Sequence, residues 1–337
     1  MLNNSSVLIT GGTGSFGQKF VEFLFNKTSP REVIIFSRDE YKQSEMAKIF
    51  PPSQYPIRYF LGDIRDKDRL LRAFIGVDYV VHAAALKQVP ALEYNPFEAV
   101  KTNILGAENV VEAALERSVK RVVAISTDKA VNPINLYGAT KLAMEKIFVA
   151  ANSYVRYRDI CFSVVRYGNV IGSRGSVVPF FIDLIKKGSL ELPVTDIRMT
   201  RFWISLEQGV NLVYNALHES KGGEVRVPKI PSMKVVDLVN AMPGNCSYKE
   251  TGIRPGEKLH ESLVGEDEGR TTIDCGKYYL ILPQYDFQGK KNYQLADAKT
   301  VPEGFAYRSD TNDKWLSAID LKGLIAEYLP TQTMQEA

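Results

Sequence analysis

The chain has 337 residues, 45% of them apolar and 24% charged, which is an ordinary globular composition and enough length for one large core or two lobes. Its net charge of +3, without any lysine–arginine run, argues against a nucleic-acid-binding protein, and no apolar run approaches the roughly 20 residues that span a membrane. The three cysteines, Cys161, Cys246 and Cys275, have no paired spacing, so the sequence predicts neither a disulfide framework nor a metal site.

The chain begins with a polar stretch, Met1–Ser6, which predicts no signal peptide and, with the cysteine pattern, a cytoplasmic protein. Val7–Ile9 is typical of a buried parallel strand, and it leads into glycines at 11, 14 and 17 and then into an amphipathic helix. Glycines between a strand and a helix let the backbone approach a pyrophosphate, which the helix N-terminus attracts. We therefore predict a dinucleotide site at this loop, with contacts from Thr13, Gly14, Ser15 and Phe16.

The second predicted strand, Glu32–Phe36, indicates which dinucleotide is bound. An acid at the end of this strand would favour the ribose hydroxyls of NAD, whereas an arginine matches the 2′-phosphate of NADP. Here Ser37, Arg38 and Lys42 form a phosphate-sized cluster of donors and positive charge. Asp39 is expected to cap the next helix. The sequence therefore predicts NADP rather than NAD.

Two further predicted strands contribute to the same site. Tyr59–Ile64 brings Asp63 to a strand end, where its carboxylate can meet the adenine amino group. Tyr79–Ala85 ends in small residues that leave room for a cofactor across the strand ends. We interpret His82 as a hydrogen-bonded histidine at a strand end, not as a catalytic one. The remaining predicted cofactor contacts are Ile64, Ala83, Thr102 and Val170.

An acid–base pair follows the fifth predicted strand. Val122–Ile125 delivers Asp128 and Lys129 to the carboxyl edge of the sheet, where ligands bind in such folds. A surface ion pair after a strand is the alternative interpretation of these two residues. Their position favours a catalytic role.

Tyr137 and Lys141 are four residues apart and share one face if residues 136–150 are helical. A lysine ammonium beside a phenol lowers the tyrosine pKa from about 10, towards the range in which it can act as a base. The Tyr-x-x-x-Lys spacing is common by chance, and it gains weight here from the glycine-rich turn. We predict that both residues are catalytic and also contact the cofactor.

Strands alternate with helices up to about residue 170, which predicts an α/β fold with a doubly wound parallel (Rossmann) sheet. Beyond it, shorter elements and frequent prolines predict a smaller lobe over the strand ends. A helix-like and a strand-like segment within 205–228 are expected to return to the main sheet. The predicted organisation is a Rossmann domain over 1–170 with 205–228, a substrate lobe over 171–204 and 229–330, and a tail over 331–337.

With the glycine-rich turn and Tyr137-x-x-x-Lys141 in order, the whole chain resembles the extended short-chain dehydrogenases/reductases. Four motifs narrow this to a resemblance to the inverting UDP-N-acetylglucosamine 4,6-dehydratases, enzymes that open the pseudaminic acid pathway for flagellin glycosylation. These motifs are Thr127–Ala130, Tyr167–Ser176, Thr195–Trp203 and Gly252–Lys258. Retaining dehydratases carry Thr-Asp-Glu where this chain has Thr-Asp-Lys.

The resemblance implies dehydration of UDP-N-acetylglucosamine at C4 and C6 with inversion at C5, giving UDP-2-acetamido-2,6-dideoxy-β-L-arabino-hexos-4-ulose. It implies that Tyr137, aided by Lys141, takes the C4 hydroxyl proton. Lys129 would remove the C5 proton, provided that burial and neighbouring positive charge lower its pKa. Asp128 would protonate the departing C6 hydroxyl, as a carboxyl kept protonated.

The resemblance also implies the substrate contacts and a homo-oligomer that needs neither nucleic acid nor membrane. Arg201 and Arg254 are expected to clamp the diphosphate of the UDP group, and Arg198 is as well explained as a solvated loop residue. The remaining expected contacts are Lys87 and Asn169 to the sugar and Thr195 and Glu257 to the uracil or ribose. Two alternatives stay open: a UDP-sugar 4-epimerase, and a non-catalytic NADP-binding regulator.

Overall fold

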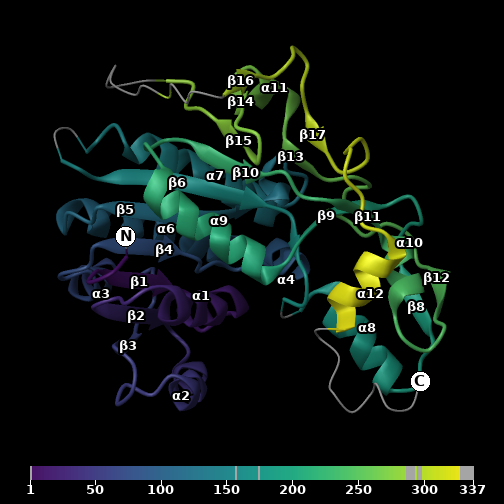
Figure 1. The fold of residues 1–337 in the computed structure, drawn as a ribbon, viewed down its shortest axis with the longest axis horizontal. Helices are drawn as coiled ribbons and strands as arrows, with labels where there is room; N and C mark the ends of the chain where they lie inside the picture. The colour runs from purple at the N-terminus through teal and green to yellow at the C-terminus, as the bar shows by residue number, and fades with distance from the viewer. Residues whose placement is uncertain (1, 156–157, 174, 286–292, 294–297, 327–337) are drawn as a thin grey trace.

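The computed structural model describes residues 2–155, 158–173, 175–285, 293 and 298–326. Figure 1 shows a large sheet between helices, with a smaller lobe beside it. The sheet has the strand order β16-β14-β15-β10-β6-β5-β4-β1-β2-β3. Its parallel strands are β1 (Ser6–Thr10), β2 (Glu32–Ser37), β3 (Ile57–Leu61), β4 (Tyr79–His82), β5 (Arg121–Thr127), β6 (Cys161–Tyr167) and β10 (Val225–Pro228). The predicted α/β fold with a mostly parallel sheet is confirmed.

The strand β1 sits at the point where the strand order reverses. It pairs with β2 on one side and with β4 on the other, and all five of its residues are buried. A strand buried on both faces reads as a continuous apolar run, which is why Val7–Ile9 is recognisable in the sequence. In a doubly wound sheet the reversal opens a crevice at the carboxyl ends of the strands, and ligands bind there.

Helices cover both faces of this sheet (Figure 1). α1 packs against α9 on one face, while α3, α6 and α7 pack in succession on the other. The helices of this part are α1 (Ser15–Lys27), α2 (Glu40–Ile49), α3 (Lys67–Ala73), α4 (Val89–Tyr94), α5 (Pro96–Val100), α6 (Gly106–Glu116), α7 (Leu136–Ala151) and α9 (Leu206–Glu219). A π-helical turn, η1 (Lys101–Leu105), precedes α6, and a 3-10 turn, η2 (Asp128–Ala130), follows β5.

The smaller lobe has an apolar core of its own, in which Phe181, Trp203 and Leu238 are buried. Its helices are α8 (Val177–Lys186), α10 (Val235–Ala241) and α12 (Ala318–Ala326), whereas α11 (Glu266–Gly269) lies beside β14 and β16 (Figure 1). Its strands form three small sheets from β7 (Asn169–Val170), β9 (Thr200–Ile204) and β11 (Ser232–Lys234), from β8 (Glu191–Val194) and β12 (Ser247–Glu250), and from β13 (Ser262–Val264) and β17 (Tyr307–Arg308).

The division between the two parts differs from the predicted one at one place. α9 and β10 lie on the large sheet, within the segment 205–228 that was expected to return to it. However, β14 (Thr272–Asp274), β15 (Tyr278–Ile281) and β16 (Lys299–Thr300) also join the large sheet, antiparallel, beyond β10. Periodicity predicts that a segment is a strand, but it does not predict the sheet edge with which the strand pairs. The prediction therefore places all of 229–330 in the lobe. The predicted tail, 331–337, lies outside the described residues.

A buried charge cluster ties α11 to the large sheet. The guanidinium of Arg166, on β6, is bonded to Glu145 of α7 and to Glu268 of α11, with N–O distances of 2.5 and 2.8 Å. Arg166 also donates to the backbone oxygen of Leu263. Arg166 and Glu145 are nearly fully buried, so the cluster fixes α11 against β6 and α7. Across the part of the chain that the structure describes, no helix has the length and apolarity to cross a bilayer.

Candidate active site

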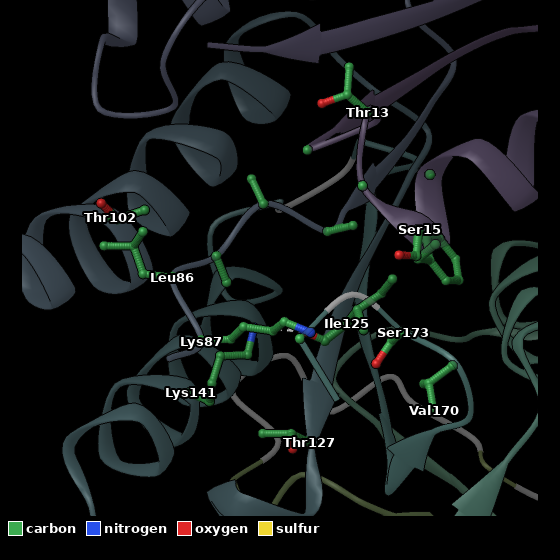
Figure 2. Close-up of a pocket in the computed structure, with 18 of the residues that line it drawn as sticks. Thr13, Ser15, Leu86, Lys87, Thr102, Ile125, Thr127, Lys141, Val170 and Ser173 are labelled. Atoms are coloured by element: carbon green, nitrogen blue, oxygen red, sulfur yellow. Dashed lines mark hydrogen bonds between the residues drawn. The ribbon is translucent and has the colours of Figure 1, made fainter. Parts of the chain in front are cut away.

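A cavity of about 640 Å³ opens at the carboxyl edge of the large sheet. Figure 2 shows Thr13 and Ser15 on the glycine-rich loop at one side of it, with Lys141 and Thr127 towards the other. Every predicted cofactor residue lines this cavity: Thr13, Gly14, Ser15, Phe16, Ser37, Arg38, Lys42, Asp63, Ile64, Ala83, Thr102, Tyr137, Lys141 and Val170. The topology therefore brings together residues that are spread over nearly half of the chain.

The glycine-rich loop fits a diphosphate. A Cβ atom on Gly17 would lie 2.3 Å from the backbone oxygen of Gly12, so only glycine permits α1 to start this close to the loop. Gly14 is the N-cap of α1 and offers no side-chain cap to the first turn. The positive end of α1 is thus open to an anion, as a dinucleotide site requires.

The end of β2 carries positive charge beside acids. Arg38 is half exposed, with its guanidinium 3.8 Å from a carboxylate oxygen of Asp63. Asp39 caps α2 as predicted, because its side chain accepts a hydrogen bond from the backbone nitrogen of Lys42. Asp39 also pairs with the Lys42 ammonium at 2.6 Å. A phosphate on the ribose could replace these weak surface pairs.

The strand β3 is shorter than predicted. It ends at Leu61 and does not continue to Ile64, because the carboxylate of Asp63 accepts bonds from the backbone and side chain of Arg65 and turns the chain. Burial favours the neutral acid, but the bonds from Arg65 outweigh it and lower the pKa of Asp63. The carboxylate still lines the cavity, next to Arg38.

The helix α7 brings Tyr137 to the acid–base pair. A Cβ atom on Gly138 would lie 2.1 Å from the backbone oxygen of Lys129, so this glycine lets α7 begin directly against η2. Asn135 caps the helix by accepting a bond of 2.8 Å from the Gly138 nitrogen. As a result Tyr137, Asp128 and Lys129 line one wall of the cavity.

The expected lowering of the Tyr137 pKa by Lys141 is wrong for this structure. Burial raises the pKa of Tyr137, and the ammonium that opposes the rise is that of Lys129. The Thr127 side chain also opposes the rise, while the Lys141 ammonium donates to the backbone oxygen of Ile125 at 2.7 Å. Burial lowers the pKa of Lys141 to about 8, against the opposing effect of Glu145.

The expected lowering of the Lys129 pKa is also wrong. The Lys129 ammonium lies 3.1 Å from an oxygen of Asp128 and 3.5 Å from an oxygen of Glu261. Burial alone would lower the pKa of Lys129, but these two carboxylates together raise it. Asp128 is fully buried, so the pair is not the solvated surface pair that the sequence left open.

Several polar atoms on the cavity wall have no hydrogen-bond partner among the described residues. They are Thr102 Oγ1, Ser126 Oγ, Asp128 Oδ2 and Asn169 Oδ1, and all four residues line the cavity. Buried polar atoms are nearly always paired in folded proteins. A polar ligand in the cavity would supply the missing partners.

The predicted substrate residues divide into two groups. Lys87 and Asn169 line the cavity, and burial followed by the Lys129 charge lowers the pKa of Lys87. The other four, Thr195, Arg201, Arg254 and Glu257, do not line it. Arg201 donates to the backbone oxygens of residues 200, 258 and 259, and Arg254 is exposed.

The neighbouring residues explain these positions. Thr195 Oγ1 lies 3.0 Å from the Met199 sulfur, and the Glu257 carboxylate accepts from the backbone nitrogen of Arg254. The loop that carries Arg254 is tied to α7, because the Asn135 side chain donates to the Gly256 oxygen at 2.8 Å. The loop thus lies close to the cavity rim even though its side chains do not form the described wall.

Two buried residues of the site were missed in the sequence. The Asn103 side chain donates to Leu86 and Thr140 and accepts from the Leu86 nitrogen, which fixes the segment before Lys87 against α7. Glu261 faces Lys129 from the lobe. Glu261 follows the Gly252–Lys258 motif by three residues, a signal that could have raised it as a candidate, whereas nothing local marks Asn103.

Comparison with known proteins agrees with this geometry. The family described as "Polysaccharide biosynthesis protein" matches residues 7–283. The inverting UDP-N-acetylglucosamine 4,6-dehydratase of Campylobacter jejuni is 52% identical over 330 residues, which cover 96% of this chain and 98% of that protein. The UDP-glucose 4-epimerase of Rickettsia canadensis is 41% identical over 317 residues, covering 89% of this chain and 92% of that protein.

Solved structures give the same result. The X-ray structure of Pen from Bacillus thuringiensis matches with a TM-score of 0.89 and 38% identity, covering 97% of this chain and 99% of that one. DesIV, a dTDP-glucose 4,6-dehydratase from Streptomyces venezuelae, matches with a TM-score of 0.68 and 24% identity over 75% of this chain and 86% of that one, a likeness of fold. The chain therefore belongs to the polysaccharide biosynthesis protein family, within the extended short-chain dehydrogenases/reductases that its motifs resemble.

Proposed function

We propose that the protein dehydrates UDP-N-acetylglucosamine at C4 and C6 with inversion at C5, using NADP. The observation that carries this proposal is the placement of Asp128, Lys129 and Tyr137 on one wall of a cavity that also contains a dinucleotide loop. The 52% identity to an inverting dehydratase over nearly the whole chain supports the same reaction. The product is UDP-2-acetamido-2,6-dideoxy-β-L-arabino-hexos-4-ulose, and we propose that it feeds pseudaminic acid synthesis for flagellin glycosylation, as the motifs imply.

The protein groups have separate tasks in this reaction. The glycine-rich loop and the end of β2 would hold NADP, which would supply the hydride chemistry at C4 and C6. The Tyr137 oxygen takes the proton of the C4 hydroxyl, with the Lys129 ammonium stabilising the phenolate. Lys141 is held by the Ile125 oxygen and contributes its charge to the cofactor side of the cavity. Lys87 and Asn169, which both line the cavity, orient the sugar.

The acid and base of the elimination can arise from one proton transfer. Elimination needs a neutral Lys129 to remove the C5 proton and a protonated Asp128 to give a proton to the leaving C6 hydroxyl. In the structure the two are an ion pair with 3.1 Å between nitrogen and oxygen. Moving one proton from Lys129 to Asp128 creates both required forms, and elimination then restores the ion pair. A later proton delivered to the opposite face of C5 gives inversion.

The choice of NADP rests on the end of β2. DesIV was solved with NAD bound, so the fold alone does not select the cofactor. Arg38 and Lys42, with Ser37 beside them, offer positive charge and donors for a 2′-phosphate. We also propose that the enzyme works in the cytoplasm as a homo-oligomer, as the resemblance to its family implies.

The test is a direct assay with UDP-N-acetylglucosamine, with the product followed by NMR spectroscopy. A 4-keto-6-deoxy sugar is expected. A galacto-configured sugar would instead identify a 4-epimerase, the activity given for the Rickettsia canadensis relative. No turnover in the presence of both NADP and NAD would favour the non-catalytic regulator.

A further inference from the structure

A carboxylate from the lobe closes the charge cluster around Lys129. Glu261 precedes β13 and is 3% exposed. Its Oε1 atom lies 3.5 Å from the Lys129 ammonium and 3.9 Å from the Arg201 guanidinium. Its Oε2 atom has no hydrogen-bond partner among the described residues. Burying a carboxylate costs folding free energy unless the charge is well paired. The contact of Glu261 with the proposed base therefore indicates a role in the reaction rather than in stability.

The backbone of Glu261 is held rigidly. Its nitrogen donates to the Ser309 hydroxyl at 2.9 Å, and its oxygen accepts from the Ser309 nitrogen at 2.8 Å. The Ser309 hydroxyl is 2.7 Å from that of Thr200, which is also bonded to a ring nitrogen of His260. Ser309 is fully buried. The backbone that carries the carboxylate is therefore fixed independently of the side chain of Lys129.

Lys129 consequently lies between two carboxylates from different parts of the molecule. Asp128 reaches it from the end of β5, and Glu261 reaches it from the lobe. The other charged or titratable groups that interact with Lys129 are Arg201, Lys87, Lys258 and Tyr137. Arg201, which could neutralise Glu261, is farther from it than Lys129 and is occupied by three backbone oxygens.

We propose that Glu261 is a positioning residue, which holds the Lys129 nitrogen at the cavity wall before and after its proton passes to Asp128. This inference rests on the proposed function for the role of Lys129. Asp128 loses its negative charge when it takes the proton from Lys129, so it cannot hold the lysine throughout the reaction. Glu261 keeps its charge and keeps the amine directed into the cavity.

The experiment removes the charge of Glu261 while keeping its shape. In Glu261→Gln, Lys129 loses one of its two carboxylates, so the pH at which it titrates should fall by at least about one unit. This is measured by NMR on protein labelled at the lysine side-chain nitrogen, with the Lys129 signal assigned by its loss in Lys129→Gln. The measurement needs no substrate, so it tests Glu261 even if the proposed reaction is wrong. An unchanged Lys129 titration in Glu261→Gln would overturn the proposal.

Activity provides the second measurement. C5 proton exchange requires the Lys129 nitrogen at the cavity wall, so its rate should fall about tenfold in Glu261→Gln. Glu224→Gln is the matched control, because Glu224 is equally buried but bonds the backbone nitrogens of residues 221 and 222, away from the cavity. C5 proton exchange in Glu224→Gln should run at the rate of the unaltered enzyme. An equal loss of exchange in both variants would contradict the proposal.

A second variant covers the case in which Glu261→Gln does not fold. Glu261→Asp keeps the charge but withdraws it by one methylene, so Lys129 is no longer held in place. The expected result is a kcat about tenfold lower with KM within about twofold, because substrate contacts are unchanged. An unaltered kcat in folded Glu261→Asp would contradict the proposal.

Discussion

At the scale of single residues, the arrangement of charge separates this site from an ordinary strand end. Asp128 is fully buried, and one of its oxygens has no partner in the described protein. Burying a charge costs several kcal/mol unless it is paired, and replacing such a pair by apolar residues is often neutral or stabilising. The pair of Asp128 and Lys129 is therefore poorly explained by stability alone. A catalytic role in the cavity explains why the pair is present.

Replacement of Tyr137 by phenylalanine tests the first oxidation. Tyr137→Phe removes the phenol that α7 brings to the cavity, which is the proposed acceptor of the C4 hydroxyl proton. We expect turnover to fall at least about 100-fold and C5 proton exchange with solvent to disappear with it. Substrate consumption and exchange are both read by NMR. Exchange at the rate of the unaltered enzyme would mean that another group takes the C4 proton.

The buried histidine His82 makes the free energy of unfolding depend on pH. It is buried, its Nδ1 atom lies 2.9 Å from the Thr10 hydroxyl, and it is confirmed as a hydrogen-bonded histidine at a strand end. Burial, and then the charge of Lys141, lower the pKa of His82 from 6.5 to about 3. Between these values the unfolded chain binds one proton more than the folded protein, so the free energy of unfolding falls as the pH falls.

This contribution of His82 is measurable. It amounts to about 1.4 kcal/mol per pH unit below pH 6.5. In His82→Gln, urea unfolding at pH 6.5, 5.5 and 4.5 should show a slope that is smaller by this amount, whatever the overall stability of the variant. Equal slopes in the two proteins would mean that His82 takes up a proton without unfolding.

At the scale of elements, the turn before α1 depends on close contact between backbones. In Gly17→Ala the new methyl group would meet the Gly12 oxygen at 2.3 Å, so the loop or the helix must move. We expect a loss of about 1–3 kcal/mol in the free energy of unfolding, together with weaker NADP binding. Gly323→Ala is the control, since a methyl group there meets no atom within 4 Å.

The control should change stability in the opposite direction. Gly323 lies inside α12, where alanine favours the helix by roughly 0.5–1 kcal/mol. Chemical denaturation measures both variants, and calorimetry measures NADP binding. If Gly17→Ala bound NADP as tightly as the unaltered protein, the loop would not be the diphosphate site.

Arg38, at the end of β2, is expected to determine the preference for NADP over NAD. Arg38→Asp replaces a half-exposed guanidinium by a carboxylate that can accept from ribose hydroxyls but repels a 2′-phosphate. We expect the ratio of NADP to NAD affinity to fall at least about 100-fold, as measured by calorimetry with each dinucleotide. Equal affinities for the two in the unaltered protein would show that the 2′-phosphate is not read at this strand end.

Sequence patterns predicted most of these elements, because they depend on local features. Buried strands such as Val7–Ile9 are continuous apolar runs, and the glycine spacing reports a steric need. Three features were not predictable in this way. The pairing of β14–β16 with the large sheet depends on the free edge of β10, which the residues of β14–β16 do not reveal. The raised pKa of Lys129 depends on Glu261, which is far from it in sequence. The position of Lys141 depends on the Ile125 oxygen, which no pattern marks.

At the scale of the whole molecule, the site lies where the two parts meet. The lobe is fixed to the large sheet by the bond from Asn135 to the Gly256 oxygen and by the Lys258 ammonium on the Val131 oxygen. The large sheet thus supplies the dinucleotide loop and the acid–base pair, while the lobe supplies Glu261 and the loop that carries Arg254.

The central claim is that this arrangement performs an internal hydride transfer with inversion at C5. One experiment tests it most directly: turnover of UDP-N-acetylglucosamine labelled with deuterium at C4, and a parallel turnover of unlabelled substrate in heavy water, both followed by NMR. We predict that the C4 label moves to C6, that solvent deuterium enters C5, and that the product has the L configuration. A product with the D configuration at C5, or a C4 label that does not reach C6, would contradict the account.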